Sequence, residues 1–193
     1  MKTLLVTGVA LAAIAFSACN GNNNSTKENS SIADTTVKSS QAGATETKSK
    51  TPLKEIITAY LQIKDGLASD NGDAAATGGN AFVDALGKID KSSMNADQKK
   101  SFEDIADDAK EMAEHIGKNA GKIEHQREHF DMLSKDMYDL VKTFGAGQTL
   151  YQDFCPMYND GKGATWLSEV KLIRNPYLGK KMPTCGSVKE TIE

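Results

Sequence analysis

Residues 122–143 read KIEHQREHFDMLSKDMYDLVKT, and their apolar side chains recur every three or four positions. That spacing places side chains on one face of an α-helix. The glycines Gly145 and Gly147 follow and end the pattern. The stretch therefore predicts a long amphipathic helix with one buried face. The residues of that face are Ile123, Phe130, Leu133, Met137, Leu140, Val141 and Phe144.

Three stretches upstream have the same apolar spacing and their own start signals. A first helix is expected after Thr51-Pro52, because threonine caps helices and proline suits the first helical position. A second is expected over about residues 74–89, and a third after Asn95, which pairs with Gln98 as a capping box does. Four amphipathic helices with short connections predict a mainly α protein built on an antiparallel four-helix bundle.

Two adjacent glycines interrupt the second predicted helix. Gly78 and Gly79 each cost on the order of 1 kcal/mol relative to alanine in a helix. Either two helices approach closely at this point or the helix frays early. The bundle as a whole is expected to span residues 51–147.

The character of the sequence changes after the bundle. Residues 148–193 contain short apolar runs broken by Gly, Pro and Asn, which predict an irregular, partly β segment packed on the helices. Trp166 and Tyr177 are expected to anchor it, with the indole N–H finding a partner. The expected extended runs are 150–154, 165–170 and 187–192.

The N-terminus has the pattern of a bacterial lipoprotein signal. Residues 1–18 supply a positive end and a short apolar run, and Cys19 follows small residues as a lipidated cysteine does. The alternative is an ordinary signal peptide cleaved nearby. Residues 19–50 are polar and predict a disordered tether. A lipid on Cys19 would attach the protein to a membrane within the cell envelope, facing the periplasm.

Two sulfur pairs carry the predicted chemistry. Cys155-Pro-Met157 and Met182-Pro-Thr-Cys185 lie in the C-terminal segment, and thiolates and thioethers together select soft ions such as Cu(I) or Ag(I). We expect Cys155, Met157, Met182 and Cys185 to form a metal site, with His129 as a further ligand. The alternative for the same residues is a Cys155–Cys185 disulfide, which an oxidising compartment favours.

The three histidines suggest a second, minor hypothesis. His125-Gln-Arg-Glu128-His129 fits the H-x-x-E-H pattern, in which two histidines hold zinc and a glutamate activates water. A zinc peptidase needs a third protein ligand, and no downstream residue supplies one. His115 is left without a role. The net charge is −3 with no basic stripe, which excludes nucleic acid as an expected partner.

Four short motifs stand in the C-terminal segment: Phe154-Cys155-Pro156-Met157, Trp166-Leu167-Ser168, Asn175-Pro176-Tyr177 with Gly179, and Met182 with Cys185-Gly186. They resemble the motifs of a bacterial family of uncharacterised envelope domains. That family occurs as small lipoproteins and appended to periplasmic adaptor subunits of heavy-metal efflux pumps. The resemblance implies an envelope location and a link to copper or related metals.

These observations predict a non-catalytic, lipid-anchored envelope protein that binds Cu(I) or Ag(I). Its role would be metal homeostasis or hand-off to an efflux adaptor or a metallochaperone. The alternative is a metal-free interaction module stapled by Cys155–Cys185. The zinc peptidase that uses His125, Glu128 and His129 is the minor alternative.

Overall fold

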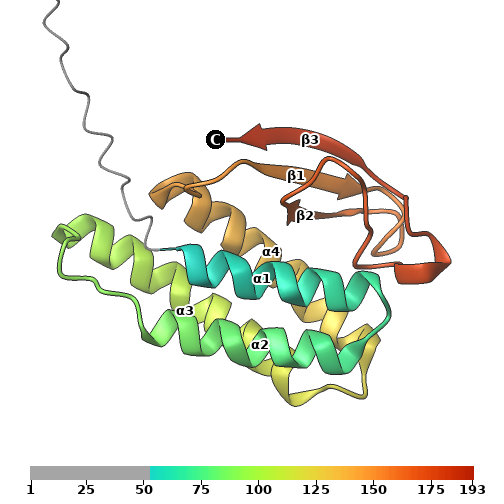
Figure 1. Cartoon of the computed structure of the whole chain (residues 1–193), viewed down its shortest axis with the longest axis horizontal. Coiled ribbons are helices and arrows are strands. Elements are labelled where there is room, and N and C mark those ends of the chain that lie inside the picture. Colours follow the sequence, from blue (N-terminus) through green and yellow to red (C-terminus); the bar gives the residue numbers. More distant parts are fainter. Residues whose placement is uncertain (1–52) are drawn as a thin grey trace, which may run out of the picture. The chain divides into compact units, whose positions relative to one another are not determined.

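The computed structural model describes residues 53–193. The predictions for the signal segment 1–18, for Cys19, for the tether and for the Thr51-Pro52 helix start lie outside this range. Four helices and a small antiparallel sheet confirm the predicted fold class (Figure 1). The helices are α1 Lys54–Ala68, α2 Gly72–Gly87, α3 Ala96–Lys118 and α4 Ile123–Phe144.

Side-chain caps fix two of the helix starts. At α3 the Asn95 side chain accepts from the Gln98 amide at 2.9 Å, and the Gln98 side chain accepts from the Asn95 amide at 3.0 Å. This reciprocal pair is the predicted capping box. At α2 the Asn71 side chain accepts from the Ala74 amide at 3.0 Å, so the turn between α1 and α2 also caps the following helix.

The C-terminal segment forms a three-stranded sheet of order β2-β1-β3, with both pairings antiparallel. The pairing of β1 with β3 shifts register between Gln152 and Asp153, where Lys189 of β3 is the extra residue of a β-bulge. Figure 1 shows the sheet lying over α1 and α4, and β2 contacts both helices. The strands are β1 Leu150–Cys155, β2 Ala164–Ser168 and β3 Ser187–Ile192, and the short 3-10 helix η1 Gly179–Lys181 precedes β3.

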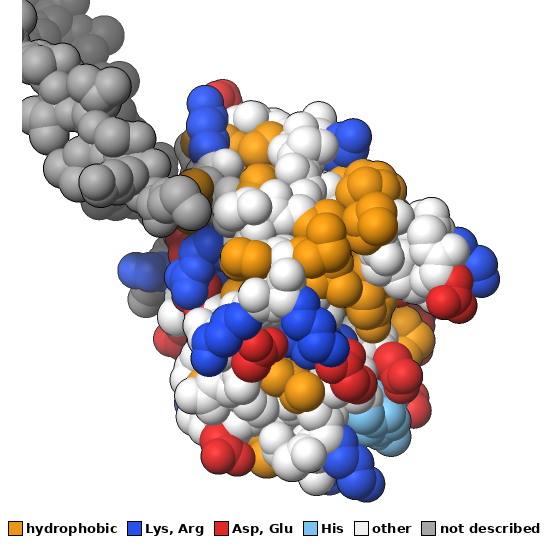
Figure 2. Space-filling view, turned by 90° about the vertical axis from the view of Figure 1, so that its right-hand side faces the viewer, with side chains coloured by type: hydrophobic (Ala, Val, Ile, Leu, Met, Phe, Trp, Pro, Cys, Tyr) orange, Lys and Arg blue, Asp and Glu red, His pale blue; other side chains and the backbone are white. Residues whose placement is uncertain are grey.

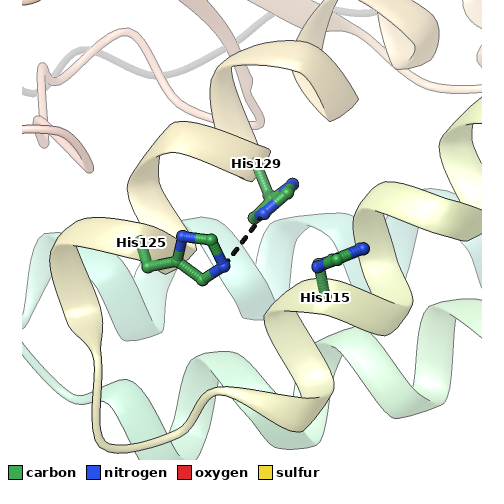
Figure 3. A group of neighbouring side chains, drawn as sticks. All are labelled: His115, His125 and His129. Carbon is green, nitrogen blue, oxygen red and sulfur yellow. Dashed lines mark hydrogen bonds between the residues drawn. The ribbon is translucent and has the colours of Figure 1, made fainter.

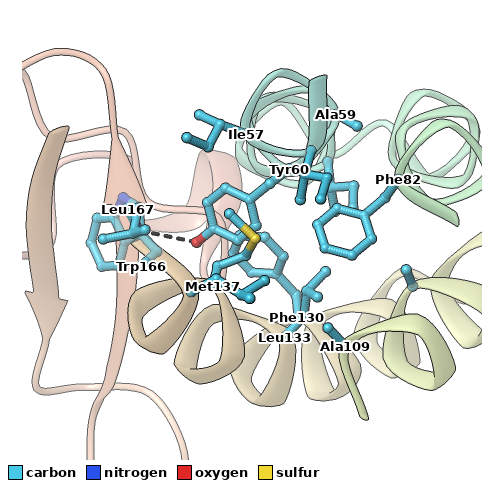
Figure 4. Packing of buried hydrophobic residues seen from close by; sticks show 14 of the residues in the cluster. Ile57, Ala59, Tyr60, Phe82, Ala109, Phe130, Leu133, Met137, Trp166 and Leu167 are labelled. Carbon is cyan, nitrogen blue, oxygen red and sulfur yellow. Dashed lines mark hydrogen bonds between the residues drawn. The ribbon is translucent and has the colours of Figure 1, made fainter. Parts of the chain in front are cut away.

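Aromatic residues join the sheet to the helices (Figure 4). Tyr60 stacks on Phe130 with ring centroids 5.1 Å apart, and its hydroxyl accepts from the Leu167 amide of β2 at 3.0 Å. Trp166 and Tyr177 are each 1% exposed, which confirms that they anchor the C-terminal segment. The expected partner for the indole is wrong, because the buried N–H of Trp166 has no hydrogen-bond partner among the described residues.

The paired glycines of α2 mark close helix contacts on two sides. A Cβ on Gly78 would lie 2.8 Å from the Ile63 backbone nitrogen of α1. One on Gly79 would lie 2.7 Å from the Ala113 carbonyl oxygen of α3. The helix continues through both positions, so the glycines reflect packing and not fraying.

Gly79→Ala should therefore lower the free energy of unfolding by about 1–3 kcal/mol, since backbone atoms of α3 block the new methyl group. Gly87→Ala is the control, because nothing lies within 4 Å of a Cβ there. That change should be neutral or stabilising by about 0.4–1 kcal/mol. Urea unfolding of the two variants measures both effects, and equal stabilities would contradict the packing argument.

Candidate metal centre

The turn between α3 and α4 brings all three histidines together. His115 lies in the last turn of α3, and His125 and His129 lie in the first two turns of α4. Gln126 fixes the two helix ends, because its side-chain amide donates to the Ile116 carbonyl of α3 at 3.0 Å and to the Gly72 carbonyl of α2 at 2.9 Å. The histidines therefore face one another across a short helical hairpin that these hydrogen bonds hold in place (Figure 3).

The three imidazoles are close enough to share one ion. One nitrogen from each ring lies within 4.8 Å of the others. The Nε2 atoms of His125 and His129 are 3.2 Å apart, and the His115 ring stacks on His129 with centroids 4.3 Å apart. Two nitrogens bound to one tetrahedral ion at roughly 2.0–2.1 Å would be about 3.3–3.4 Å apart. The His125–His129 separation is thus already that of a ligand pair.

The outward-facing ring nitrogens have their own partners. Nδ1 of His125 lies 3.3 Å from the Glu128 carboxylate, and Nδ1 of His129 lies 3.4 Å from the Met112 sulfur. A neutral imidazole that donates through Nδ1 keeps the lone pair on Nε2 free for a metal. In that tautomer both Nε2 lone pairs are available to an ion between the rings, whereas without an ion the 3.2 Å contact is a hydrogen bond in which one Nε2 carries the proton. This arrangement is typical of histidine ligands, which use one nitrogen for the ion and the other for orientation.

The surroundings of His129 lower its pKa. Burial lowers its pKa, and the neighbouring His115 and His125 lower it further, while Glu128 and Glu111 oppose the shift. Only a neutral imidazole can bind a metal ion, so the lowered pKa favours binding at neutral pH.

The site is open to solvent on one side. The His115 and His125 side chains are 46% and 40% exposed, and Figure 2 shows histidine at the surface next to acidic side chains. Carboxylates surround the cluster, with Glu111 4.0 Å from His115 Nε2 and Glu128 beside His125. An ion held here would have at least one coordination position facing water, and the acidic surroundings would attract it.

The two predicted cysteine ligands also meet. Cys155 at the end of β1 is buried, and its sulfur lies 2.6 Å from that of Cys185, which precedes β3. Burial raises the pKa of the Cys185 thiol, and the neighbouring Cys155 raises it further. The thioethers are more exposed, with Met157 at 59% and Met182 at 42%. The structure thus joins the two thiols, while the four-sulfur ligand set stays a prediction.

His129 lies with the other histidines on the α3 side of α4. The ring of His129 contacts His115, His125 and Met112. The sequence pattern predicts roles for His129 and His125 but none for His115. The short turn between the helices is the feature that indicates its place, since a short connection between antiparallel helices places the last turn of one beside the first turn of the next.

His115, which lies upstream of the H-x-x-E-H pattern, could be the third metal ligand that the zinc-peptidase hypothesis requires. Glu128, however, contacts the ring of His125 and its side chain is 66% exposed. In this position the carboxylate orients a ligand, which is a different task from activating a metal-bound water.

The fold and cluster define a helical-bundle protein with a surface group of three histidines. Residues 56–149 match a family model described as "Protein of unknown function (DUF3347)". The match covers nearly all of the four helices and ends before the Cys155-Pro-Met157 motif. No curated protein and no solved structure matches the chain. None of the helices in residues 53–193 is long and apolar enough to cross a membrane.

Proposed function

We propose that the protein binds a transition-metal ion between α3 and α4 through His115, His125 and His129. The observation that carries the proposal is the 3.2 Å separation of the His125 and His129 Nε2 atoms, with each Nδ1 facing a partner of its own. Imidazole binds zinc, copper, nickel and iron, so the three rings alone indicate a transition-metal ion but do not select one of these elements. His115 would complete the set by a rotation of its half-exposed side chain.

The proposed setting is the cell envelope. The lipoprotein-like N-terminus with Cys19 supports a lipid-anchored protein, and the C-terminal motifs support a link to heavy-metal efflux. Within this setting the ion is Cu(I) or Ag(I), and the role is homeostasis or hand-off to an efflux adaptor or metallochaperone. A surface site with an open coordination position suits transfer, because an acceptor can add a ligand before the donor releases the ion.

Metal analysis and titration of the purified protein test the proposal with two matched double variants. His125→Asn/His129→Asn should abolish stoichiometric binding, because at most one imidazole remains. Cys155→Ser/Cys185→Ser should retain one ion per chain with an affinity near that of the wild type. The reverse result, with binding lost only in the cysteine variant, would move the site to the predicted sulfur ligands.

The pH dependence of binding identifies the ligand type. Affinity should be level above about pH 7 and fall below about pH 6, because protons then compete for imidazole. The lowered pKa of His129 keeps this ligand available below the pH at which an ordinary histidine is half protonated. Competition titrations between about pH 5 and 9 measure the profile. An affinity that keeps rising up to about pH 8.5 would instead indicate thiolate ligands.

A second candidate is supported by the contact between the Cys155 and Cys185 sulfurs. In an oxidising envelope this pair would form a disulfide that closes the connection between β1 and β3. It would stabilise the fold by about 2–4 kcal/mol and leave Met157 and Met182 as surface residues. Intact mass under non-reducing conditions, with and without thiol alkylation, distinguishes this state from free thiols available to a soft ion.

The peptidase remains the minor alternative. Zinc-loaded protein and its Glu128→Gln variant, tested on a mixture of unstructured peptides, would separate hydrolysis from binding alone. Zinc-dependent cleavage lost in the variant would support the enzyme.

A further inference from the structure

A methionine sulfur lies against the histidine cluster. Met112 is one helical turn before His115 on α3, so the two side chains share a face of that helix. Its Sδ atom is 3.4 Å from Nδ1 of His129. Met112 is half-buried and packs against the core, so the position of its sulfur is set by the surrounding side chains.

The distance has a meaning in coordination chemistry. A nitrogen at roughly 2.0 Å and a sulfur at roughly 2.3 Å from one ion, with an angle of about 105–110° between the bonds, would be about 3.4–3.5 Å apart. The Met112 sulfur and the His129 ring nitrogen already have this separation. His129 therefore faces a nitrogen ligand on one side of its ring and a thioether on the other.

Thioethers discriminate strongly among metal ions. A neutral, polarizable sulfur is a good ligand for Cu(I) and a poor one for Zn(II), which prefers thiolate, imidazole and carboxylate. The partly buried position would also shield the sulfur–metal contact from water.

We propose that Met112 is a ligand of this site and makes it selective for Cu(I). The inference rests on the proposed three-histidine function and adds a residue and an oxidation state to it. With Cu(I), His129 binds the ion through Nδ1, which faces the Met112 sulfur, and the His115 ring that stacks on His129 can supply a further ligand. With Zn(II), His129 uses Nε2, which faces His125, and the Met112 sulfur stays outside the ligand set.

The chain offers a matched control for this proposal. Met132 lies three residues after His129 on α4, is 41% exposed, and makes no hydrogen bond to the histidine rings, unlike Met112. Replacing either methionine by leucine removes the sulfur and keeps an apolar side chain of similar volume. A difference between the two variants then reports the sulfur of Met112 and not a general loss of thioether.

The test compares Cu(I) and Zn(II) affinities of the full mature protein by competition with a chelator, under anaerobic conditions for copper. Met112→Leu should weaken Cu(I) binding by about 10–100-fold and leave Zn(II) binding within about twofold, while Met132→Leu changes neither. Equal Cu(I) affinities for Met112→Leu and wild type, or equal losses for both ions, would overturn the proposal. In the latter case Met112 only supports the ring of His129.

A spectroscopic measurement separates this inference from the function on which it rests. X-ray absorption of Cu(I)-loaded Cys155→Ser/Cys185→Ser protein should show a sulfur ligand that disappears when Met112→Leu is added. Nitrogen-only coordination in the parent would reject Met112 and retain the three histidines. Failure of the wild-type protein to bind either ion would reject the proposed function itself.

Discussion

Replacing Arg127 by alanine should destabilise the fold by about 2–4 kcal/mol, because it removes the charged hydrogen bonds of a buried guanidinium. The Arg127 side chain is 3% exposed. Its guanidinium donates to the Pro176 carbonyl at 2.9 Å, to the Leu67 carbonyl at 3.1 Å and to the Asp70 carboxylate at 2.5 Å. One side chain thus joins α4 to the end of α1, to the turn before α2 and to the loop that precedes η1.

The cost has two physical sources. Removing the guanidinium leaves the buried Pro176 carbonyl without its donor, at about 1–3 kcal/mol, whereas the Leu67 carbonyl keeps the Asp70 amide as a donor at 3.1 Å. It also removes the charge that holds Asp70 in place. Partial burial alone would raise the pKa of Asp70, but the hydrogen bond and charge of Arg127, helped by the Lys180 amide, lower it. The alanine variant should lose that contribution, which the wild type retains until the pH falls through the lowered pKa.

Urea unfolding of the metal-free protein measures the effect. Circular dichroism follows the helices, and the fluorescence of the single tryptophan, Trp166, follows the sheet. Glu124→Ala is the control, since Glu124 is a 66% exposed partner of the same guanidinium and should cost at most about 1 kcal/mol. Similar losses in the two variants would show that the buried hydrogen bonds of Arg127 contribute little.

The helices of this protein are predictable because their apolar spacing is regular. The predicted inward face of α4 is buried from Phe130 through Val141, and the third predicted strand coincides with β3 Ser187–Ile192. The second helix starts two residues earlier than expected, at Gly72, because Asn71 and not a later residue provides its cap. These differences are small since capping chemistry and periodicity act locally along the chain.

Arg127 and Gln126 show where the sequence alone misleads. Both are polar, yet they lie three and four positions after Ile123 and three and four before Phe130, on the buried face of α4. Their partners are backbone carbonyl groups of distant segments, and no residue type encodes a carbonyl partner. The H-x-x-E-H pattern predicts a role for the histidines on one face of the helix, while Gln126 and Arg127, which lie between them, stabilise the fold from the other face.

The candidate site was partly predictable for a similar reason. The spacing of His125 and His129 places them on one helix face, and this is a local property. The contribution of His115 and Met112 depends on the pairing of two helices, which the sequence specifies only through the length of the turn between them. The cysteine pair depends on strand order, since Cys155 and Cys185 meet because β3 pairs with β1.

Asp153 is a further residue that local patterns misplace. Alternation from Leu150 along β1 would put Asp153 on the exposed face, but Asp153 is completely buried, like Cys155 two residues later, and pairs with the buried Trp166 of β2. Its two carboxylate oxygens have no hydrogen-bond partners among the described residues. Burial raises the pKa of Asp153 to about 7, and the nearby charge of Lys64 opposes the shift only in part.

Stability should consequently fall as the pH rises from about 4 to about 7. In this range the folded protein keeps a proton on Asp153 that the unfolded chain has already released, so unfolding is favoured by each further increase in pH. The difference of about three pH units corresponds to a loss of up to about 4 kcal/mol above pH 7 relative to pH 4. Burial also raises the pKa of Asp136 to about 6, which lowers stability with rising pH in the same way. The lowered pKa of His129 has the opposite effect, because the unfolded chain then binds the extra proton.

Asp153→Asn isolates this contribution, because asparagine has nearly the same shape and does not titrate. We expect the variant and the wild type to be about equally stable near pH 4, and the variant to gain steadily up to about pH 7 and then keep a constant advantage of about 2–4 kcal/mol. Urea unfolding of both proteins at each pH gives the difference between their free energies of unfolding. The contributions of Asp136 and His129 are the same in both proteins and cancel in this difference. A difference that does not change with pH would mean that the carboxylate is as well solvated in the folded protein as in the unfolded chain. Burial would then not control its charge.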